Sequence, residues 1–134
     1  MWTSIGDPIQ FNCMSFEYTI WYEDALIRVK VTGSPDYLSL DKLWHDIVAA
    51  CQKNNCLKVL GESNTEDWKE EDAYDHAAIF EAAGMSNRYR VGWVEANALA
   101  RETIRLAEAV VTNRDVVTGR VFSRLADAER WLAE

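Results

Sequence analysis

The sequence contains few of the residues that break regular structure or cross-link a chain. Its 134 residues include two prolines, six glycines and three cysteines. The cysteines, Cys13, Cys51 and Cys56, are odd in number and match no metal or redox spacing. We therefore expect reduced thiols, with Cys51 and Cys56 packed as small hydrophobic side chains. This pattern favours a cytoplasmic protein.

Long apolar runs and an excess of positive charge are also missing. No stretch approaches the roughly 20 apolar residues that span a bilayer, and residues 1–14 lack a basic segment followed by an apolar one. The formal net charge is −8, which disfavours binding to phosphate backbones or anionic lipid. We expect a soluble, acidic protein with no membrane span and no nucleic-acid partner.

The chain lacks the motifs that would mark it as an enzyme. It has no Gly-x-Ser-x-Gly elbow, no phosphate-binding glycine loop and no dinucleotide fingerprint. Asp41 and His45, like Asp72 and His76, are four residues apart on predicted helices, a spacing that can orient a base. No motif places a nucleophile beside them, so we interpret both as modest side-chain pairs. We predict a non-enzymatic protein without catalytic residues or a bound cofactor.

Acidic residues concentrate between Glu62 and Asp75, where seven occur. Hard cations take oxygen ligands, but this run lacks the spacing and central glycine of a calcium loop. Acidic side chains also stabilise the start of a helix, because they face the positive end of its dipole. We therefore interpret the run as a solvated helix start and predict no metal site.

The hydrophobic pattern alternates between strand and helix periods along the chain. Ser39 is the expected N-cap of the first helix, and Asn54-Asn55 its expected end. Tyr74, Ala77 and Phe80 are expected to face inward from the second helix. The apolar positions of the third helix are Leu99, Thr103, Leu106 and Val110. The expected strands are 15–22, 25–32, 57–61, 89–96 and 116–122, and the expected helices are 40–53, 70–83, 98–112 and 123–132.

This order predicts an α/β fold. The first two strands form an antiparallel hairpin, and the later strands are joined by helical crossovers, which make parallel pairs. We expect a single-layer, mixed, mostly parallel sheet with about four helices. Residues 15–134 form one domain, and residues 1–14 are either an N-terminal arm or an extra edge strand. A homodimer is compatible with a small domain that has apolar edges.

Several short motifs resemble a known family. They are Gly33 at the end of a strand, Glu66-Asp67-Trp68, and Phe122 followed by 127–132, Asp-Ala-Glu-Arg-Trp-Leu. Together they resemble the bacterial SpoIIAA-like branch of the STAS-like proteins, also described as STAS/Sec14-like. The resemblance implies a SpoIIAA/STAS-like fold in a non-enzymatic regulatory or binding domain. The switch-serine motif of the anti-sigma-factor antagonists is absent, because the corresponding segment reads Gly-Glu-Ser-Asn-Thr-Glu-Asp.

The sequence is compatible with two functions. The first is a regulatory or protein-interaction domain with a protein partner. The second is a carrier of a small apolar or lipid-like ligand, favoured by the six tryptophans and the Sec14-like relationship. The candidate interaction loop comprises Ser63, Asn64, Thr65, Glu66, Asp67 and Trp68, because it leaves a parallel strand at its carboxyl end. Trp68 either contacts a partner there or packs against the sheet edge.

Overall fold

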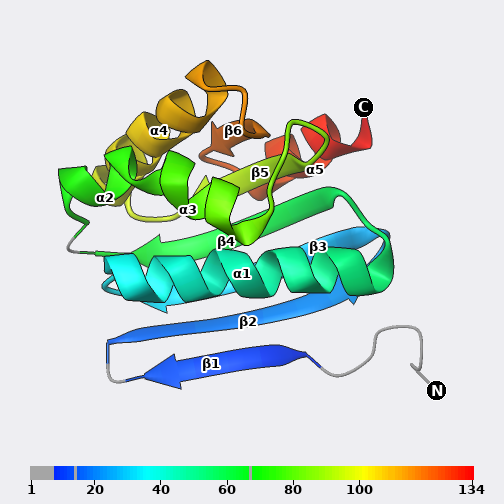
Figure 1. Ribbon diagram of the computed structural model, residues 1–134, viewed down its shortest axis with the longest axis horizontal. Coiled ribbons are helices and arrows are strands. Elements are labelled where there is room, and N and C mark those ends of the chain that lie inside the picture. Colours follow the sequence, from blue (N-terminus) through cyan, green and yellow to red (C-terminus); the bar gives the residue numbers. More distant parts are fainter. Residues whose placement is uncertain (1–7, 14, 67) are drawn as a thin grey trace.

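The structure is a computed structural model that describes residues 8–13, 15–66 and 68–134. Six strands form one sheet whose spatial order, β1-β2-β3-β4-β5-β6, follows the order of the chain (Figure 1). The strands are β1 (Ile9–Cys13), β2 (Phe16–Glu23), β3 (Leu26–Gly33), β4 (Lys58–Thr65), β5 (Arg90–Glu95) and β6 (Thr118–Phe122). The first three strands pair antiparallel, and β3 to β6 pair parallel.

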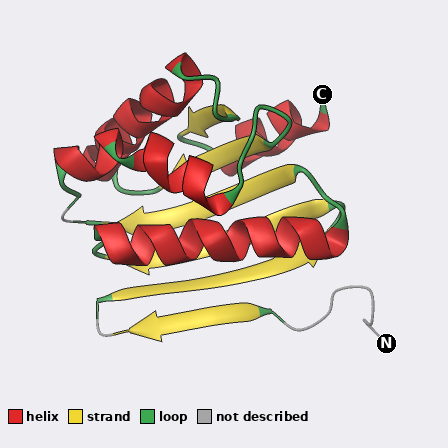
Figure 2. Ribbon diagram, viewed as in Figure 1, coloured by secondary structure: helices red, strands yellow, loops and turns green. Residues whose placement is uncertain are grey.

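Five helices connect or follow these strands in the described part of the chain. They are α1 (Tyr37–Asn54), α2 (Glu70–Tyr74), α3 (His76–Ala83), α4 (Ala98–Asn113) and α5 (Leu125–Ala133). Helices α1 to α4 lie on one face of the sheet, whereas α5 lies on the other (Figure 2). None of the described helices is long and apolar enough to cross a membrane.

The main core lies between the sheet and α1, α3 and α4. Alternate residues of the strands point into it, as the period of two requires. A smaller core forms on the opposite face, where Leu132 of α5 is 1% exposed and packs with Leu60 and Ala128. Gly92 of β5 makes room for it, because a Cβ there would lie 3.2 Å from Leu132 Cδ1. The basic side chain of Lys58 secures the end of α5 by donating to the Leu132 carbonyl at 2.6 Å.

The predicted α/β class with a mixed sheet and an N-terminal antiparallel hairpin is confirmed. Within the segment 1–14, Ile9–Cys13 forms the edge strand β1, while residues 1–7 and 14 lie outside the described residues. The expected N-cap Ser39 is wrong. Helix α1 begins at Tyr37, three residues before the expected start, because the Asp36 carboxylate accepts the backbone N–H of Ser39 at 2.8 Å and caps the first turn. The expected end is confirmed, since Asn55 adopts the left-handed conformation.

The predicted helix 70–83 is two helices. A turn at Asp75 separates α2 from α3 and rotates their faces, so Tyr74 is 54% exposed while Ala77 and Phe80 are buried. The inward position predicted for Tyr74 is therefore wrong.

The buried face of α4 is shifted by one residue from the predicted stripe. Ala100, Ile104, Ala107 and Val111 face inward, whereas Leu99 is 83% exposed. Asn97 caps this helix, with its side chain accepting the Leu99 N–H.

Candidate functional site

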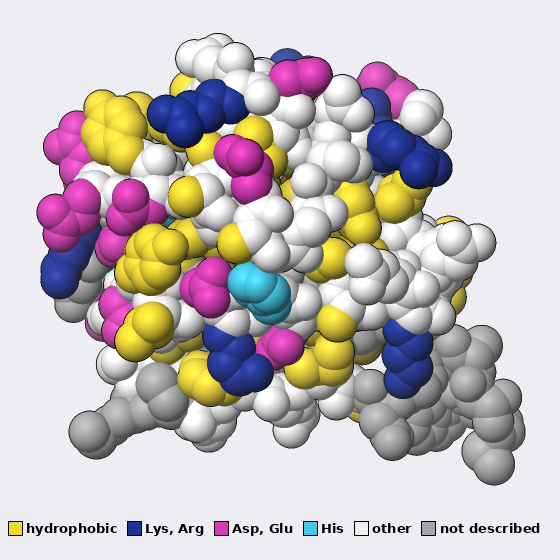
Figure 3. Space-filling view, in the orientation of Figure 1, with side chains coloured by type: hydrophobic (Ala, Val, Ile, Leu, Met, Phe, Trp, Pro, Cys, Tyr) yellow, Lys and Arg dark blue, Asp and Glu magenta, His cyan; other side chains and the backbone are white. Residues whose placement is uncertain are grey.

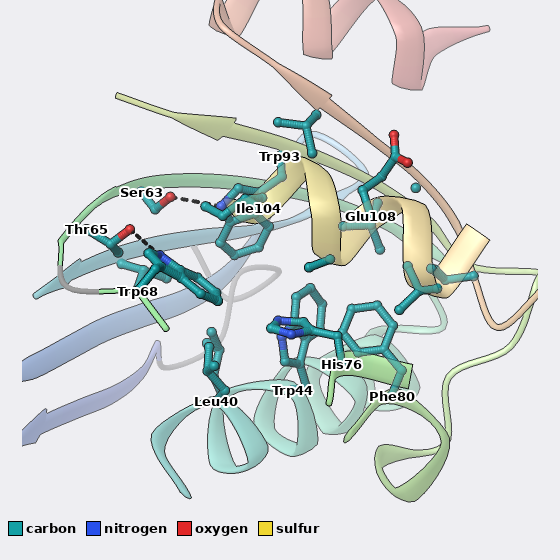
Figure 4. A pocket seen from close by; sticks show the side chains of 18 of the residues that line it. Leu40, Trp44, Ser63, Thr65, Trp68, His76, Phe80, Trp93, Ile104 and Glu108 are labelled. Atoms are coloured by element: carbon teal, nitrogen blue, oxygen red, sulfur yellow. Dashed lines mark hydrogen bonds between the residues drawn. The ribbon is translucent and has the colours of Figure 1, made fainter. Parts of the chain in front are cut away.

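A partly open cavity of about 70 Å³ lies in the main core, between the sheet and helices α1, α3 and α4. Its walls are almost entirely apolar, with aromatic rings as the largest groups. Figure 4 shows side chains from α1, α3, α4 and the sheet converging on this space. The labelled apolar members of the lining are Leu40, Trp44, Trp68, Phe80, Trp93 and Ile104.

The floor of the cavity depends on a close fit between two strands. Gly61 on β4 is the register partner of Trp93 on β5. A Cβ at Gly61 would lie 2.1 Å from the Trp93 indole, so the missing side chain lets the indole lie across the neighbouring strand. Trp44 of α1 contacts both Trp93 and Phe80, with ring centroids 5.5 and 4.3 Å away. These contacts make one wall rigid and aromatic.

A fully buried carboxylate stands at the carboxyl end of β5. Glu95 is 0% exposed, and its Oε1 atom accepts the hydroxyl protons of Ser63 and Thr65, both at 2.6 Å. Its Oε2 atom accepts the backbone N–H groups of Thr65 at 3.0 Å and of Asn97 at 2.9 Å. Four donors thus surround the carboxylate and compensate for its burial.

Two tryptophans connect this polar cluster to the cavity. The Trp93 indole N–H donates to Ser63 Oγ at 2.8 Å, and the Trp68 indole N–H donates to Thr65 Oγ1 at 2.7 Å. Each hydroxyl accepts a hydrogen bond from an indole N–H and donates its own proton to Glu95, so both hydroxyl groups are held in one orientation. The dashed lines in Figure 4 mark both indole bonds. Trp68 is half-buried and lies between β4 and α2, where it covers one side of the cavity.

His76 is the polar ring in the aromatic part of the lining. It is 5% exposed and lies between Trp68 and Phe80, with ring centroids 5.6 and 5.7 Å away. Burial lowers the pKa of its imidazole to about 4, so the ring is neutral near pH 7. Its Nδ1 atom lies 2.7 Å from the Asp72 carbonyl oxygen. A carbonyl only accepts, so Nδ1 carries the proton and Nε2 has a lone pair.

The residues of the candidate interaction loop have different environments. The strand β4 extends to Thr65, because its pairing with β3 runs on to Gly33, and the side chains of Ser63 and Thr65 are buried. Asn64 and Glu66 are exposed, and Asp67 lies outside the described residues. Trp68 packs against the main core. The segment is thus partly cavity wall and partly surface.

Sequence reasoning missed Glu95 and misread the surroundings of His76. The signal for Glu95 was available, because Val91, Trp93 and Glu95 share one face of a strand by the period of two. Both Asp–His pairs form contacts. His45 Nδ1 lies 2.8 Å from the Asp41 carbonyl oxygen and 3.5 Å from its carboxylate, whereas His76 contacts Asp72 through the carbonyl.

Four exposed apolar side chains lie outside the cavity, on helices that follow the carboxyl ends of the parallel strands. Tyr37 and Leu38 near the start of α1 are 44% and 77% exposed, Tyr74 is the last residue of α2, and Leu99 lies near the start of α4. Helix α2 packs against α4, and Asp36 beside α1 interacts electrostatically with Asp72 and Lys69. We call these four residues the apolar edge.

Acidic groups surround the apolar edge. Asp36, Glu66, Glu70, Glu71 and Glu102 are exposed around it. Figure 3 shows hydrophobic and acidic side chains interspersed along the side on which Figure 1 places α2 and the start of α1. The described residues hold no group of three or more His, Cys, Asp or Glu side chains that could bind a metal ion.

No protein-family model matches this chain, and no curated protein matches it significantly. The resemblance to the STAS-like proteins, and the function that it implies, therefore stay predictions.

Proposed function

We propose that this protein is a non-enzymatic binding domain that holds a small, largely apolar molecule in the cavity beside Trp68. The cavity itself carries this proposal. Protein interiors are packed as densely as organic crystals and contain few voids larger than a water molecule. A space of about 70 Å³ that is lined by three tryptophans and partly open to solvent therefore stands out in so small a core.

The volume limits the size of the ligand. Pockets for drug-sized molecules have roughly 300 to 1,000 Å³, and a cavity of about 150 Å³ accommodates benzene. The present cavity is about half that size with Trp68 in place. A ring-sized ligand needs more room, which Trp68 can provide by moving outward with the loss of its hydrogen bond to Thr65.

The polar groups near the cavity support binding rather than catalysis. The hydroxyl protons of Ser63 and Thr65 are held by Glu95, and His76 lies among aromatic rings. A hydroxyl nucleophile requires a base that takes its proton and a site for the reacting atom beside both. The hydrogen bonds around Ser63 and Thr65 instead fix the two indoles that border the cavity.

Titration with toluene tests this proposal. We expect saturable binding, measured by tryptophan fluorescence, because Trp44, Trp68 and Trp93 line the cavity. Ala107 of α4 also lines it and is 4% exposed, so Ala107→Leu fills the space and should weaken binding at least tenfold. The matched control is Ala109→Leu on the exposed side of the same helix, which should bind toluene as the unmodified protein does. Equal binding by both variants would place toluene elsewhere and refute the proposal.

A second candidate function is recognition of a protein segment by the apolar edge. Exposed apolar side chains that are close together mark interaction surfaces, and the acidic rim selects a partner of opposite charge. The fitting partner is an amphipathic segment with basic residues on its polar side. This function uses the outer surface and is independent of the cavity.

A synthetic helical peptide of leucine and lysine is a direct probe of the apolar edge. We expect the double variant Leu38→Ser, Leu99→Ser to bind it at least tenfold more weakly than the unmodified protein. Leu57→Ser is the control, because Leu57 is also exposed but precedes β4 at the opposite end of the strand. A peptide with glutamate in place of lysine should not bind. If the control weakens binding as much as the double variant, attraction is unspecific and this function is wrong.

A further inference from the structure

Two ring nitrogens in the cavity lining, His76 Nε2 and Trp44 Nε1, have no hydrogen-bond partner among the described residues. His76 donates its Nδ1 proton to the Asp72 carbonyl, which leaves the Nε2 lone pair as an acceptor. The ring is more than nine-tenths buried and belongs to the lining. Figure 4 shows it extending from α3 toward Trp68 and Leu40.

Four neighbouring donors are already committed. The indole N–H groups of Trp68 and Trp93 bind Thr65 and Ser63, and the protons of those two hydroxyls go to Glu95. The indole N–H of Trp44 is buried without a partner, and no hydrogen bond joins it to His76. The His76 Nε2 atom, unlike Trp44 Nε1, keeps some accessible surface, so a molecule in the cavity can reach it and donate a hydrogen bond to it.

Resting on the proposed function, we propose that the ligand of the cavity is a small neutral molecule with an apolar, ring-sized body and one hydroxyl group, which donates to His76 Nε2. The apolar walls favour a ligand with an apolar body, and the Nε2 acceptor favours a ligand that carries a hydroxyl group. A neutral ligand fits the lining best, because the walls are mostly apolar and an ion would lose its water on entering; the charged residues of the lining are Glu108 and Arg120. A saturated hydrocarbon fits the walls and leaves Nε2 unpaired.

Phenol and toluene test the hydroxyl, since the two molecules have nearly the same shape. We expect the unmodified protein at pH 7.5 to bind phenol about fivefold more tightly than toluene, in line with one neutral hydrogen bond. His76→Phe keeps the aromatic ring and removes the acceptor, so it should bind the two probes equally. His45→Phe is the control, because His45 is an exposed histidine on α1 and should keep the preference for phenol.

Nitrogen NMR of the histidine ring gives a second readout that needs no variant. We expect phenol, and not toluene, to shift the Nε2 resonance of His76 in the direction of an accepted hydrogen bond. Equal affinity for the two probes without this shift would overturn the assignment of the hydroxyl and leave the proposed function standing. A preference for phenol that persists in His76→Phe would also overturn it. If neither probe binds, the proposed function itself fails, and this inference fails with it.

Discussion

Four hydrogen-bond donors of the core converge on one side chain, Glu95. Its Oε2 atom faces two backbone N–H groups, which cannot turn away, and its Oε1 atom faces two hydroxyls. An acceptor-only group satisfies all four donors at once. Any replacement of this carboxylate leaves donors without acceptors in a place that water does not reach.

We expect Glu95→Gln to lower the free energy of unfolding by about 2 kcal/mol. The glutamine oxygen can serve the two N–H groups, but its NH₂ group then faces hydroxyls that already accept from Trp68 and Trp93. The hydroxyl protons of Ser63 and Thr65 lose the acceptor that Glu95 supplied. Urea denaturation measures the loss, and Glu102→Gln on the exposed side of α4 is the control. An unchanged midpoint for Glu95→Gln would show that the four bonds contribute little.

Single residues also explain why the site was only partly predictable. The number of tryptophans and the strand that holds Trp93 follow from the sequence pattern. The pairing of Gly61 with Trp93, which shapes the cavity floor, depends on the register of two strands separated by a helical pair. Periodicity assigns a face to each residue but does not align one strand with the next. The cavity was therefore beyond sequence reasoning.

Among the elements, the hairpin between β2 and β3 contains an unusual turn. Asp24 and Ala25 connect Glu23 to Leu26, and both have positive φ angles, 55° and 62°. A two-residue turn with this backbone matches the right-handed twist of the strands. Asp tolerates the left-handed region, whereas Ala is penalised by its Cβ. The turn is compatible with the strands but strained at one residue.

We expect Ala25→Gly to raise the free energy of unfolding by about 0.5 to 1 kcal/mol. Glycine removes a strain of about 1 to 2 kcal/mol, and the greater freedom of the unfolded chain offsets part of this gain. Thermal melting measures the difference. Ala49→Gly, at an exposed position inside α1, is the matched control and should destabilise by about 1 kcal/mol. A loss of stability in both variants would mean that the turn is not strained.

Helix α4 shows where prediction from the hydrophobic pattern fails. Two neighbouring stripes of α4 are apolar, one through Leu99 and one through Ala100, and the structure buries the one with smaller residues. Alanine at positions 100 and 107 leaves room for close packing against the surrounding elements. Hydrophobicity alone favours the stripe with leucine, so the choice requires knowledge of the neighbours.

At the scale of the whole molecule, buried titratable groups set the pH range of stability. Burial lowers the pKa of His76 from 6.5 to about 4, so the unfolded chain binds the proton more readily between these values. Stability is then complete above pH 6.5 and falls as the pH drops toward 4. On the alkaline side, burial raises the pKa of Cys51 from 9.0 to about 12. The unfolded chain loses this proton first, so stability falls again above pH 9.

We expect the unmodified protein to lose up to about 3 kcal/mol of stability through His76 between pH 6.5 and 4. Asp72 and Glu108 oppose part of this loss, because burial raises the pKa of both carboxyl groups and favours their protonation in the fold. Asp75 also faces His76 and favours its charged form. Urea denaturation across this range should show a shallower slope for His76→Phe and an unchanged slope for His45→Ala. Parallel slopes in all three proteins would assign the acid sensitivity to other groups.

The architecture was more predictable than the site. Alternating strand and helix periods after a hairpin determine an α/β sheet with parallel crossovers, because few other topologies satisfy short, right-handed connections. The break at Asp75 and the burial of Glu95 left this result unchanged, since they alter neither the strands nor their order.

The order of the strands has a consequence for how the protein is made. Each strand of this sheet is bonded to the strands that precede and follow it in the chain. During synthesis, a strand leaving the ribosome therefore meets a partner that has already emerged, and none has to wait for a distant segment. Loop closure stays short at every step, which favours rapid assembly and limits the time for which strand edges are open to other chains. The sheet can grow strand by strand in the direction of translation.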